Sequence, residues 1–212
     1  MQNHPQANSQ KTLRLVQFAL LLAIEALFCF VPLLGSIPFT PNIVATLSHI
    51  PVIVAAILLG TGAGAAMGFA FGLFSFLVWT FMTPNPIMAF VFTPVYAPGN
   101  VWSLVICFVP RILIGVVVGL SARLFVRLFR NKMLAYGLAG LLGSLTSTLL
   151  VILGIYVFFA PAFAEAFDTS VNTLMAFLAA GILLPNGVPE AILGAVTGSA
   201  VCRPLEKILF RT

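Results

Sequence analysis

Long apolar segments dominate the chain, and glycine, proline and polar residues separate them. Each segment is continuously apolar rather than alternating, which favours membrane-spanning helices over the strands of a barrel. About 20 apolar residues are enough for a helix to cross a hydrocarbon core about 30 Å thick. We therefore predict an all-α integral membrane protein, a bundle of six transmembrane helices over residues 13–34, 43–59, 65–81, 101–122, 134–159 and 188–201.

The connections between these segments differ in kind. Residues 82–100 carry four prolines, one glycine and no charge, which predicts a long irregular connection that packs as a lid. The short "GTGAG" run at 60–64 predicts an antiparallel hairpin of the second and third helices. Residues 160–187 are too broken for a span, so we expect a loop with a short or re-entrant helix. Residues 1–12 form a polar tail, disordered over 1–10, and residues 13–212 form a single transmembrane domain.

Composition agrees with this picture, because 61% of the residues are hydrophobic and 7% are charged. With six spans, nine basic residues fall on one side of the membrane, whereas the other side carries Glu165 and Asp168. Basic residues mark the cytoplasmic side, so both termini are expected there. The nine residues are Lys11, Arg14, Arg123, Arg127, Arg130, Lys132, Arg203, Lys207 and Arg211.

Several chemistries are disfavoured by the residues that are present. The three cysteines, Cys29, Cys107 and Cys202, lie in separate apolar segments without the spacing of metal ligands, so we expect buried small side chains and no metal. "GTGAG" lacks the Lys-Ser/Thr pair of a phosphate-binding loop, and no clustered nucleophile is evident. We expect no enzyme activity, no cofactor and no nucleic-acid partner.

The residue that most needs an explanation is Arg111, a cation about ten residues into the fourth helix. It shares a helical face with Cys107, Gly115 and Val118, and small residues mark contacts between membrane helices. Pro110 lacks a backbone donor and can leave the carbonyl of a residue one turn earlier free. Two interpretations are open: Arg111 binds an anion such as a carboxylate, or it forms a structural ion pair with Glu190 or Glu25.

The sixth segment carries a second polar group, because Asn186, Glu190 and Thr197 share one face beside a glycine stripe. This arrangement suits the wall of a binding pocket. Glu190 also falls in what would be the first helical turn, where a carboxylate is favoured by the helix dipole. Capping alone is therefore the alternative.

Four further residues are candidates for ligand binding. His49 has no second ligand at metal spacing, so a hydrogen-bonded structural histidine is favoured over a metal or proton site. Trp79, Asn85 and Tyr96 gather around the long connection and could close over a ligand, or they could belong to an interfacial aromatic belt.

In the first helix, Ala19 and Ala23 share one face and Glu25 points away from it. The residues alone favour ordinary helix packing for this small-residue face.

The chain resembles a known family. The stretches that carry the likeness are the alanine pattern of Ala19 and Ala23, "SHIPVIVAAILLGTGAGAAMGFAFGLFSF" at 48–76, "VPRILIGVVVGL" at 109–120 and "NGVPEAIL" at 186–193. They resemble the substrate-binding S component of energy-coupling factor (ECF) vitamin transporters, most of all the members assigned to pantothenate. The resemblance covers residues 13–209.

The resemblance implies a six-helix bundle in the prokaryotic cytoplasmic membrane that captures a vitamin at its outer face, under the loops after helices one, three and five. It also implies a transmembrane coupling subunit and two ATP-binding subunits as partners, with Ala19 and Ala23 facing the coupling subunit. Pantothenate has one carboxylate, which would suit Arg111. The alternative function is a self-sufficient proton-coupled carrier of a small organic anion, with Glu25 and Glu190 as the coupling acids.

Overall fold

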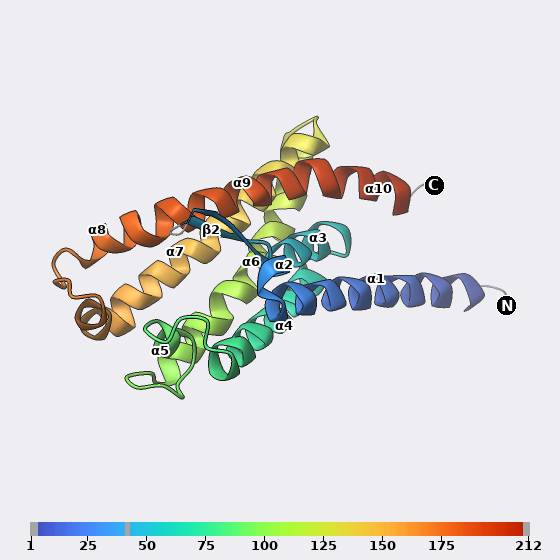
Figure 1. The fold of residues 1–212 in the computed structure, drawn as a ribbon. Helices are drawn as coiled ribbons and strands as arrows, with labels where there is room; N and C mark the ends of the chain where they lie inside the picture. Colours follow the sequence, from blue (N-terminus) through green and yellow to red (C-terminus); the bar gives the residue numbers. More distant parts are fainter. Residues whose placement is uncertain (1–3, 41–42, 210–212) are drawn as a thin grey trace.

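The structure, a computed structural model, describes residues 4–40 and 43–209. The chain folds as a helical bundle with one small hairpin (Figure 1). Within the described residues, five helical stretches are long and apolar enough to cross a membrane. They are Gln10–Phe30, Thr61–Phe81, Val101–Leu128, Lys132–Ala166 and Leu174–Ile208. The predicted all-α membrane architecture is therefore confirmed in its main features.

Helix α1 (His4–Phe30) begins nine residues before its expected start, within the segment expected to be disordered. It ends just before Pro32, and the short helix α2 (Pro32–Gly35) follows. Next comes an antiparallel hairpin of β1 (Ser36–Thr40) and β2 (Ile43–Thr46), in which Ser36 pairs with Thr46.

The second expected span is the main difference between prediction and structure. Instead of a helix over 43–59, the chain forms strand β2 and then helix α3 (Ile50–Leu58), which has nine residues. A helix of that length is about 14 Å long, less than half of the hydrocarbon core. Helix α3 contacts α1, α4, α6, α7 and the last helix, so its apolar residues face protein on most sides. The hydrophobicity of α3 is therefore that of a helix buried in the protein core.

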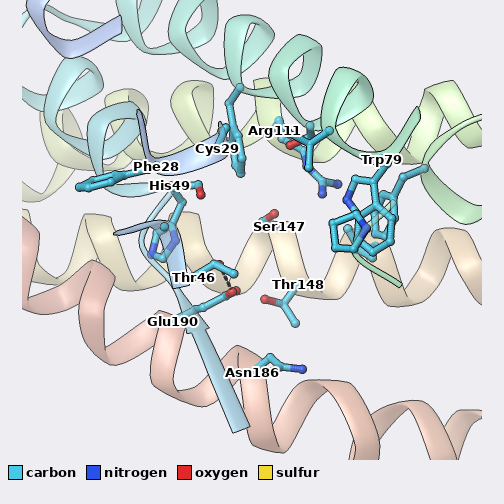
Figure 2. A pocket seen from close by; sticks show the side chains of 18 of the residues that line it. Phe28, Cys29, Thr46, His49, Trp79, Arg111, Ser147, Thr148, Asn186 and Glu190 are labelled. Atoms are coloured by element: carbon cyan, nitrogen blue, oxygen red, sulfur yellow. Dashed lines mark hydrogen bonds between the residues drawn. The ribbon is translucent and has the colours of Figure 1, made fainter. Parts of the chain in front are cut away.

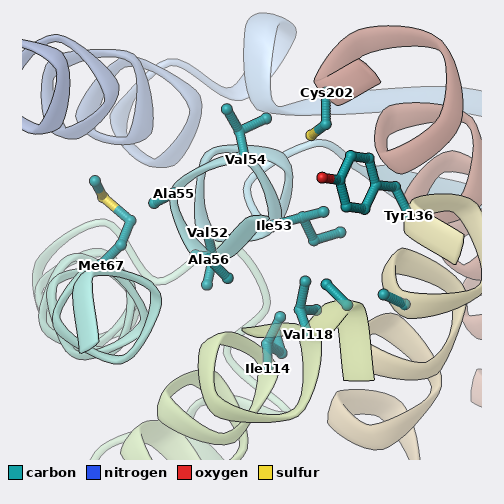
Figure 3. Close-up of a cluster of buried hydrophobic side chains, with 12 residues drawn as sticks. Val52, Ile53, Val54, Ala55, Ala56, Met67, Ile114, Val118, Tyr136 and Cys202 are labelled. Atoms are coloured by element: carbon teal, nitrogen blue, oxygen red, sulfur yellow. The ribbon is translucent and has the colours of Figure 1, made fainter. Parts of the chain in front are cut away.

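The core around α3 is one of two apolar clusters. Val52, Ile53 and Ala55 of α3 are fully buried against Met67 of α4 and Val118 of α6 (Figure 3). The second cluster joins the short helix α5 (Ala89–Phe92) to α6 and α7 through Phe90, Ile106 and Phe159. The predicted lid connection therefore carries a buried apolar anchor of its own.

Helices α4 (Thr61–Phe81) and α6 (Val101–Leu128) pack with their backbones in contact. A Cβ atom added to Gly64 would be within 3.0 Å of the carbonyl oxygen of Gly115, and one added to Gly68 would collide with the backbone of Arg111. Small residues allow this close approach in membrane helices. The predicted antiparallel pair of α3 and α4 is confirmed, since only Leu59 and Gly60 separate these contacting helices.

The second half of the bundle consists of two long helices. Helix α7 (Lys132–Ala166) continues to Ala166 through a kink at Phe159, two residues before Pro161. After a turn over 167–173, a continuous helical stretch runs from Leu174 to Leu209. The loop with a short or re-entrant helix expected over 160–187 is therefore reduced to this turn, and the rest of that range belongs to the two long helices. The parts of the last helix are α8 (Leu174–Leu178), η1 (Ala179–Gly187), α9 (Val188–Val196), η2 (Thr197–Cys202) and α10 (Arg203–Leu209).

The prediction failed there because Gly181, Pro185 and Gly187 suggested a break. The structure accommodates them in the π-helical turns of η1, where the shifted hydrogen-bond pattern tolerates proline. The start of α1 and the end of α10 lie at the same end of the bundle, opposite α5 and the turn before α8 (Figure 1).

Candidate functional site

A cavity of about 650 Å³ lies between α4, α6, α7, the last helix and the end of the hairpin. Cavities of this size accommodate small-molecule ligands, for which about 300–1,000 Å³ is usual. Six of the seven predicted binding residues line it. They are Arg111, Asn186, Glu190, Asn85, Trp79 and His49 (Figure 2).

Arg111 lies on the interior face of α6, as the helical wheel predicted, with Cys107, Gly115 and Val118 buried on the same face. Pro110 cannot donate a backbone hydrogen bond, so the carbonyl of Ile106 is left without its helical donor. The Nη1 atom of Arg111 donates to this oxygen at 2.9 Å. One side of the guanidinium thus supplies the hydrogen bond that the helix backbone lacks at Pro110.

The rest of the guanidinium faces the cavity. Its carbon atom lies 5.7 Å from the ring centre of Phe71 and 5.0 Å from that of Phe92. The Nε atom is buried and has no hydrogen-bond partner among the described residues. In that same part of the chain, neither Glu190 nor Glu25 is within ion-pair distance of Arg111. The structural ion pair considered from the sequence is therefore absent there, and the cation is available to a ligand.

Aromatic side chains enclose the arginine. Trp79, near the end of α4, stacks on Phe92 with 4.8 Å between ring centres, and Phe92 in turn packs against Arg111. Asn85 lies in the loop after α4 and accepts a hydrogen bond from the backbone of Ile87 at 3.0 Å. Residues of the long connection therefore close this end of the cavity.

Tyr96 is the predicted site residue that does not line the cavity. Its hydroxyl donates to the backbone carbonyl of Thr80 at 2.9 Å and lies 3.0 Å from the hydroxyl of Thr83. The side chain therefore ties the long connection to the end of α4.

Glu190 and His49 occupy the other end of the cavity, away from Arg111 (Figure 2). Helix α9 carries Glu190, and the hydroxyl of Thr46 on strand β2 donates to its carboxylate. His49 precedes α3 and is buried, and its Nε2 atom has no partner among the residues described. Glu190 is therefore more than a helix cap, because it joins the hairpin to the last helix at the cavity wall.

Helix α7 contributes hydroxyl groups that the sequence analysis did not select. Ser144, Ser147 and Thr148 line the cavity, and the buried Oγ atom of Ser144 lacks a partner in the described chain. Thr148 donates to the carbonyl of Ser144 at 3.3 Å. Their spacing of three and four residues puts them on one helical face, which was the available signal.

The lining of the cavity carries buried polar atoms that a ligand could bind. Three buried polar atoms on its lining residues, in Arg111, His49 and Ser144, have no partner within the described ranges 4–40 and 43–209. Buried polar groups of folded proteins are nearly always hydrogen-bonded, and an unsatisfied one costs about 1–3 kcal/mol. A ligand with a carboxylate and several hydroxyl or amide groups would satisfy them.

The predicted partner face lies on α1. Ala19 and Ala23 are exposed there, whereas Glu25 is fully buried and accepts a weak hydrogen bond from Cys29 at 3.7 Å. The alanine face and the acid therefore point in different directions, as the helical wheel predicted.

Comparison with known proteins agrees with these observations. Residues 13–197 match the family described as "ECF transporter, substrate-specific component". The chain is 30% identical over 192 residues to the pantothenic acid transporter PanT of Lactococcus lactis subsp. cremoris (strain MG1363), with 89% of each chain covered. It is also 33% identical over 138 residues to the pantothenate transporter PanT of Leuconostoc mesenteroides subsp. mesenteroides, with 63% of this chain and 61% of the relative covered.

The family match spans most of the chain and includes the helices that form the cavity. Both relatives are transporters by name, and the apolar helices indicate a multi-pass protein of the cell membrane. The chain belongs to the family of substrate-specific components of ECF transporters.

Proposed function

We propose that this protein is the high-affinity subunit that captures pantothenate for an ECF-type importer. The observation that carries the proposal is the partly unsatisfied guanidinium of Arg111 in a cavity of ligand size. The two relatives named for pantothenic acid or pantothenate supply the choice of vitamin. Family membership favours this function over a self-sufficient proton-coupled carrier.

The distribution of charge favours one orientation of the vitamin. Pantothenate has a carboxylate at one end and hydroxyl groups at the other, with an amide between them. The carboxylate would pair with Arg111, because guanidinium groups bind carboxylates with two parallel hydrogen bonds. The hydroxyl end would lie near Glu190 and His49, with the α7 hydroxyls and Asn186 along the middle. Glu190 would repel a second carboxylate and thus select for a ligand with one anionic end.

Energy for uptake would come from partner subunits. The family suggests a membrane-embedded coupling subunit and two ATP-binding subunits, with no cofactor in this chain. Residues 13–212 would act as a single domain that binds the vitamin, and Ala19 and Ala23 would face the coupling subunit.

We further propose six crossings of the membrane with both termini in the cytoplasm. The second crossing would be made by the hairpin and α3 together. This is supported by the turn at Gly60, which lies beside Arg123 near the end of α6, so the chain has returned to the end where the basic residues gather.

The test is vitamin binding by the purified protein. We expect Arg111→Gln to weaken binding of pantothenate by about 10- to 100-fold, since a hydrogen bond to a charged group contributes roughly 1.5–3 kcal/mol. Isothermal titration calorimetry with pantothenate and with pantothenol, in which an alcohol replaces the carboxylate, measures this directly. The variant should bind pantothenol as the wild type does.

Arg130→Gln provides the matched control, because Arg130 is exposed and does not line the cavity. It should leave both affinities unchanged. Equal losses for pantothenate and pantothenol in Arg111→Gln would show that the arginine maintains the fold rather than recognising the carboxylate.

A further inference from the structure

A second, smaller cavity of about 270 Å³ lies near the end of the bundle where the basic residues gather. It is open to the outside and is bordered by the turn between α3 and α4, the last turns of α6 and the start of α7. Gly60, Arg123, Arg127 and Tyr136 line it, together with apolar residues of α3 and α6. It is separate from the vitamin cavity and shares no lining residue with it.

Two guanidinium groups point to an anionic occupant. Arg123 and Arg127 are four residues apart on α6, so they lie on one face on successive turns. Neither forms an ion pair with any residue in the described ranges. Glu206 is the described acid near this end, and it is bound by Lys132 at 2.8 Å and by Arg203. The charge of the two arginines is therefore not balanced by described protein groups.

The backbone beside the arginines is also suited to an anion. Gly60 has a φ of 102°, a conformation that other residues rarely adopt, and an added Cβ would be 3.4 Å from Nη2 of Arg123. No side chain caps the first turn of α4 that follows it. The positive end of that helix dipole adds to the field of the two cations.

The surface next to the cavity is apolar. Leu120, Leu124 and Leu128 are each more than half exposed on α6, one position or one turn from the arginines. In a membrane protein such side chains face acyl chains. A free anion would gain nothing from them, whereas a lipid could place its phosphate on the arginines and its chains along the leucines. Basic pockets between membrane helices bind lipid head groups in this way.

We propose that this cavity binds the phosphate of an anionic glycerophospholipid through Arg123 and Arg127. The proposal is independent of the vitamin that the protein carries. The lipid would hold the turn between α3 and α4 against α6, because Gly60 and the two arginines border the same space.

The experiment measures thermal unfolding of the purified protein in detergent during titration with short-chain lipids. Dioctanoyl-phosphatidylglycerol should raise the melting temperature in a saturable way, with half-saturation at a concentration at least five-fold lower than for dioctanoyl-phosphatidylcholine. Arg123→Gln/Arg127→Gln should abolish that preference. Arg130→Gln/Lys207→Gln removes the same charge at positions that are exposed, as Arg123 and Arg127 are, but lie outside the cavity, and it should retain the preference. Native mass spectrometry should show one tightly retained anionic lipid that is lost only in the first variant.

Four results would overturn the proposal. The first is an equal response to the two lipids in the wild-type protein. The second is an equal loss of preference in both double variants, which would indicate general surface charge. The third is a shift produced by inorganic phosphate alone at matched concentration, which would assign the cavity to free anions. If Arg123→Gln/Arg127→Gln instead loses the coupling subunit while its lipid response is unchanged, the arginines serve a protein carboxylate and the lipid assignment is wrong.

Discussion

At the scale of single residues, the site depends on a proline and a glycine that do not touch the cavity. Pro110 frees the carbonyl that receives Nη1 of Arg111, so the arginine is anchored to its own helix. Gly68 of α4 lies directly against the backbone of Arg111. The guanidinium is therefore held by a fixed backbone rather than by a carboxylate, which keeps its remaining donors available.

The close approach at Gly68 makes a prediction about stability. Gly68→Ala should lower the free energy of unfolding by about 1–3 kcal/mol, because the new methyl group must push α4 away from α6. Gly62→Ala on the same helix is the matched control, since an added Cβ there meets nothing within 4 Å. It should be neutral or stabilising by up to about 1 kcal/mol. Denaturant unfolding in detergent measures both, and equal effects would contradict the packing argument.

At the scale of elements, α1 has two faces that differ in burial. Phe18, Leu21 and Leu22 pack against the core around α3, and Glu25 is buried on that side. Ala19 and Ala23 lie on the exposed side. Small residues at exposed positions allow another membrane helix to approach closely.

Enlarging that outer face should separate assembly from vitamin binding. Ala19→Leu/Ala23→Leu is expected to abolish co-purification of the coupling subunit, because the added side chains keep the two helices apart. Pantothenate binding should be unchanged, since neither alanine lines the cavity. Ala66→Leu, at an exposed position of α4, is the control and should assemble normally. Normal co-purification of the double variant would rule out the alanine face as the partner surface.

At the scale of the whole molecule, the two ends of the bundle differ in charge and in the turns that they contain. The start of α1, the end of α10, the turn between α3 and α4 and the turn between α6 and α7 belong to one end (Figure 1). The turn before α8, which follows Glu165 and contains Asp168, belongs to the other. An excess of arginine and lysine on one side indicates the cytoplasmic side.

This asymmetry predicts the labelling of introduced cysteines in intact cells. Ser170→Cys lies in the turn before α8 and should react with a membrane-impermeant maleimide from outside. Arg130→Cys, between α6 and α7, should react only after the membrane is permeabilised. The wild-type chain, whose Cys107 and Cys202 are buried, serves as the background. Reversed labelling of the two positions would invert the proposed orientation.

Much of the site could be predicted because its residues are chemically conspicuous in an apolar chain. Arg111, Asn186 and Glu190 stand out against their surroundings, and helical periodicity alone puts Arg111 on an interior face. The hydroxyls of Ser144, Ser147 and Thr148 are less conspicuous in the sequence, because serine and threonine in membrane helices often bond to their own backbone. Tyr96 was predicted as a site residue because it lies within the long connection over 82–100, but its hydroxyl is directed to α4.

The sequence by itself determined the membrane class, the approximate location of four of the five long helices in the described residues and the isolation of one buried cation, because these follow from local composition and periodicity. Only the tertiary structure decided that the second apolar segment is a short core helix and that the last helix begins at Leu174. An apolar run has the same composition whether it faces lipid or protein, and a glycine or proline breaks a helix only where neighbours do not support it. The tertiary structure also showed that Arg111 is paired with a carbonyl oxygen, because that choice depends on which side chains meet across the bundle.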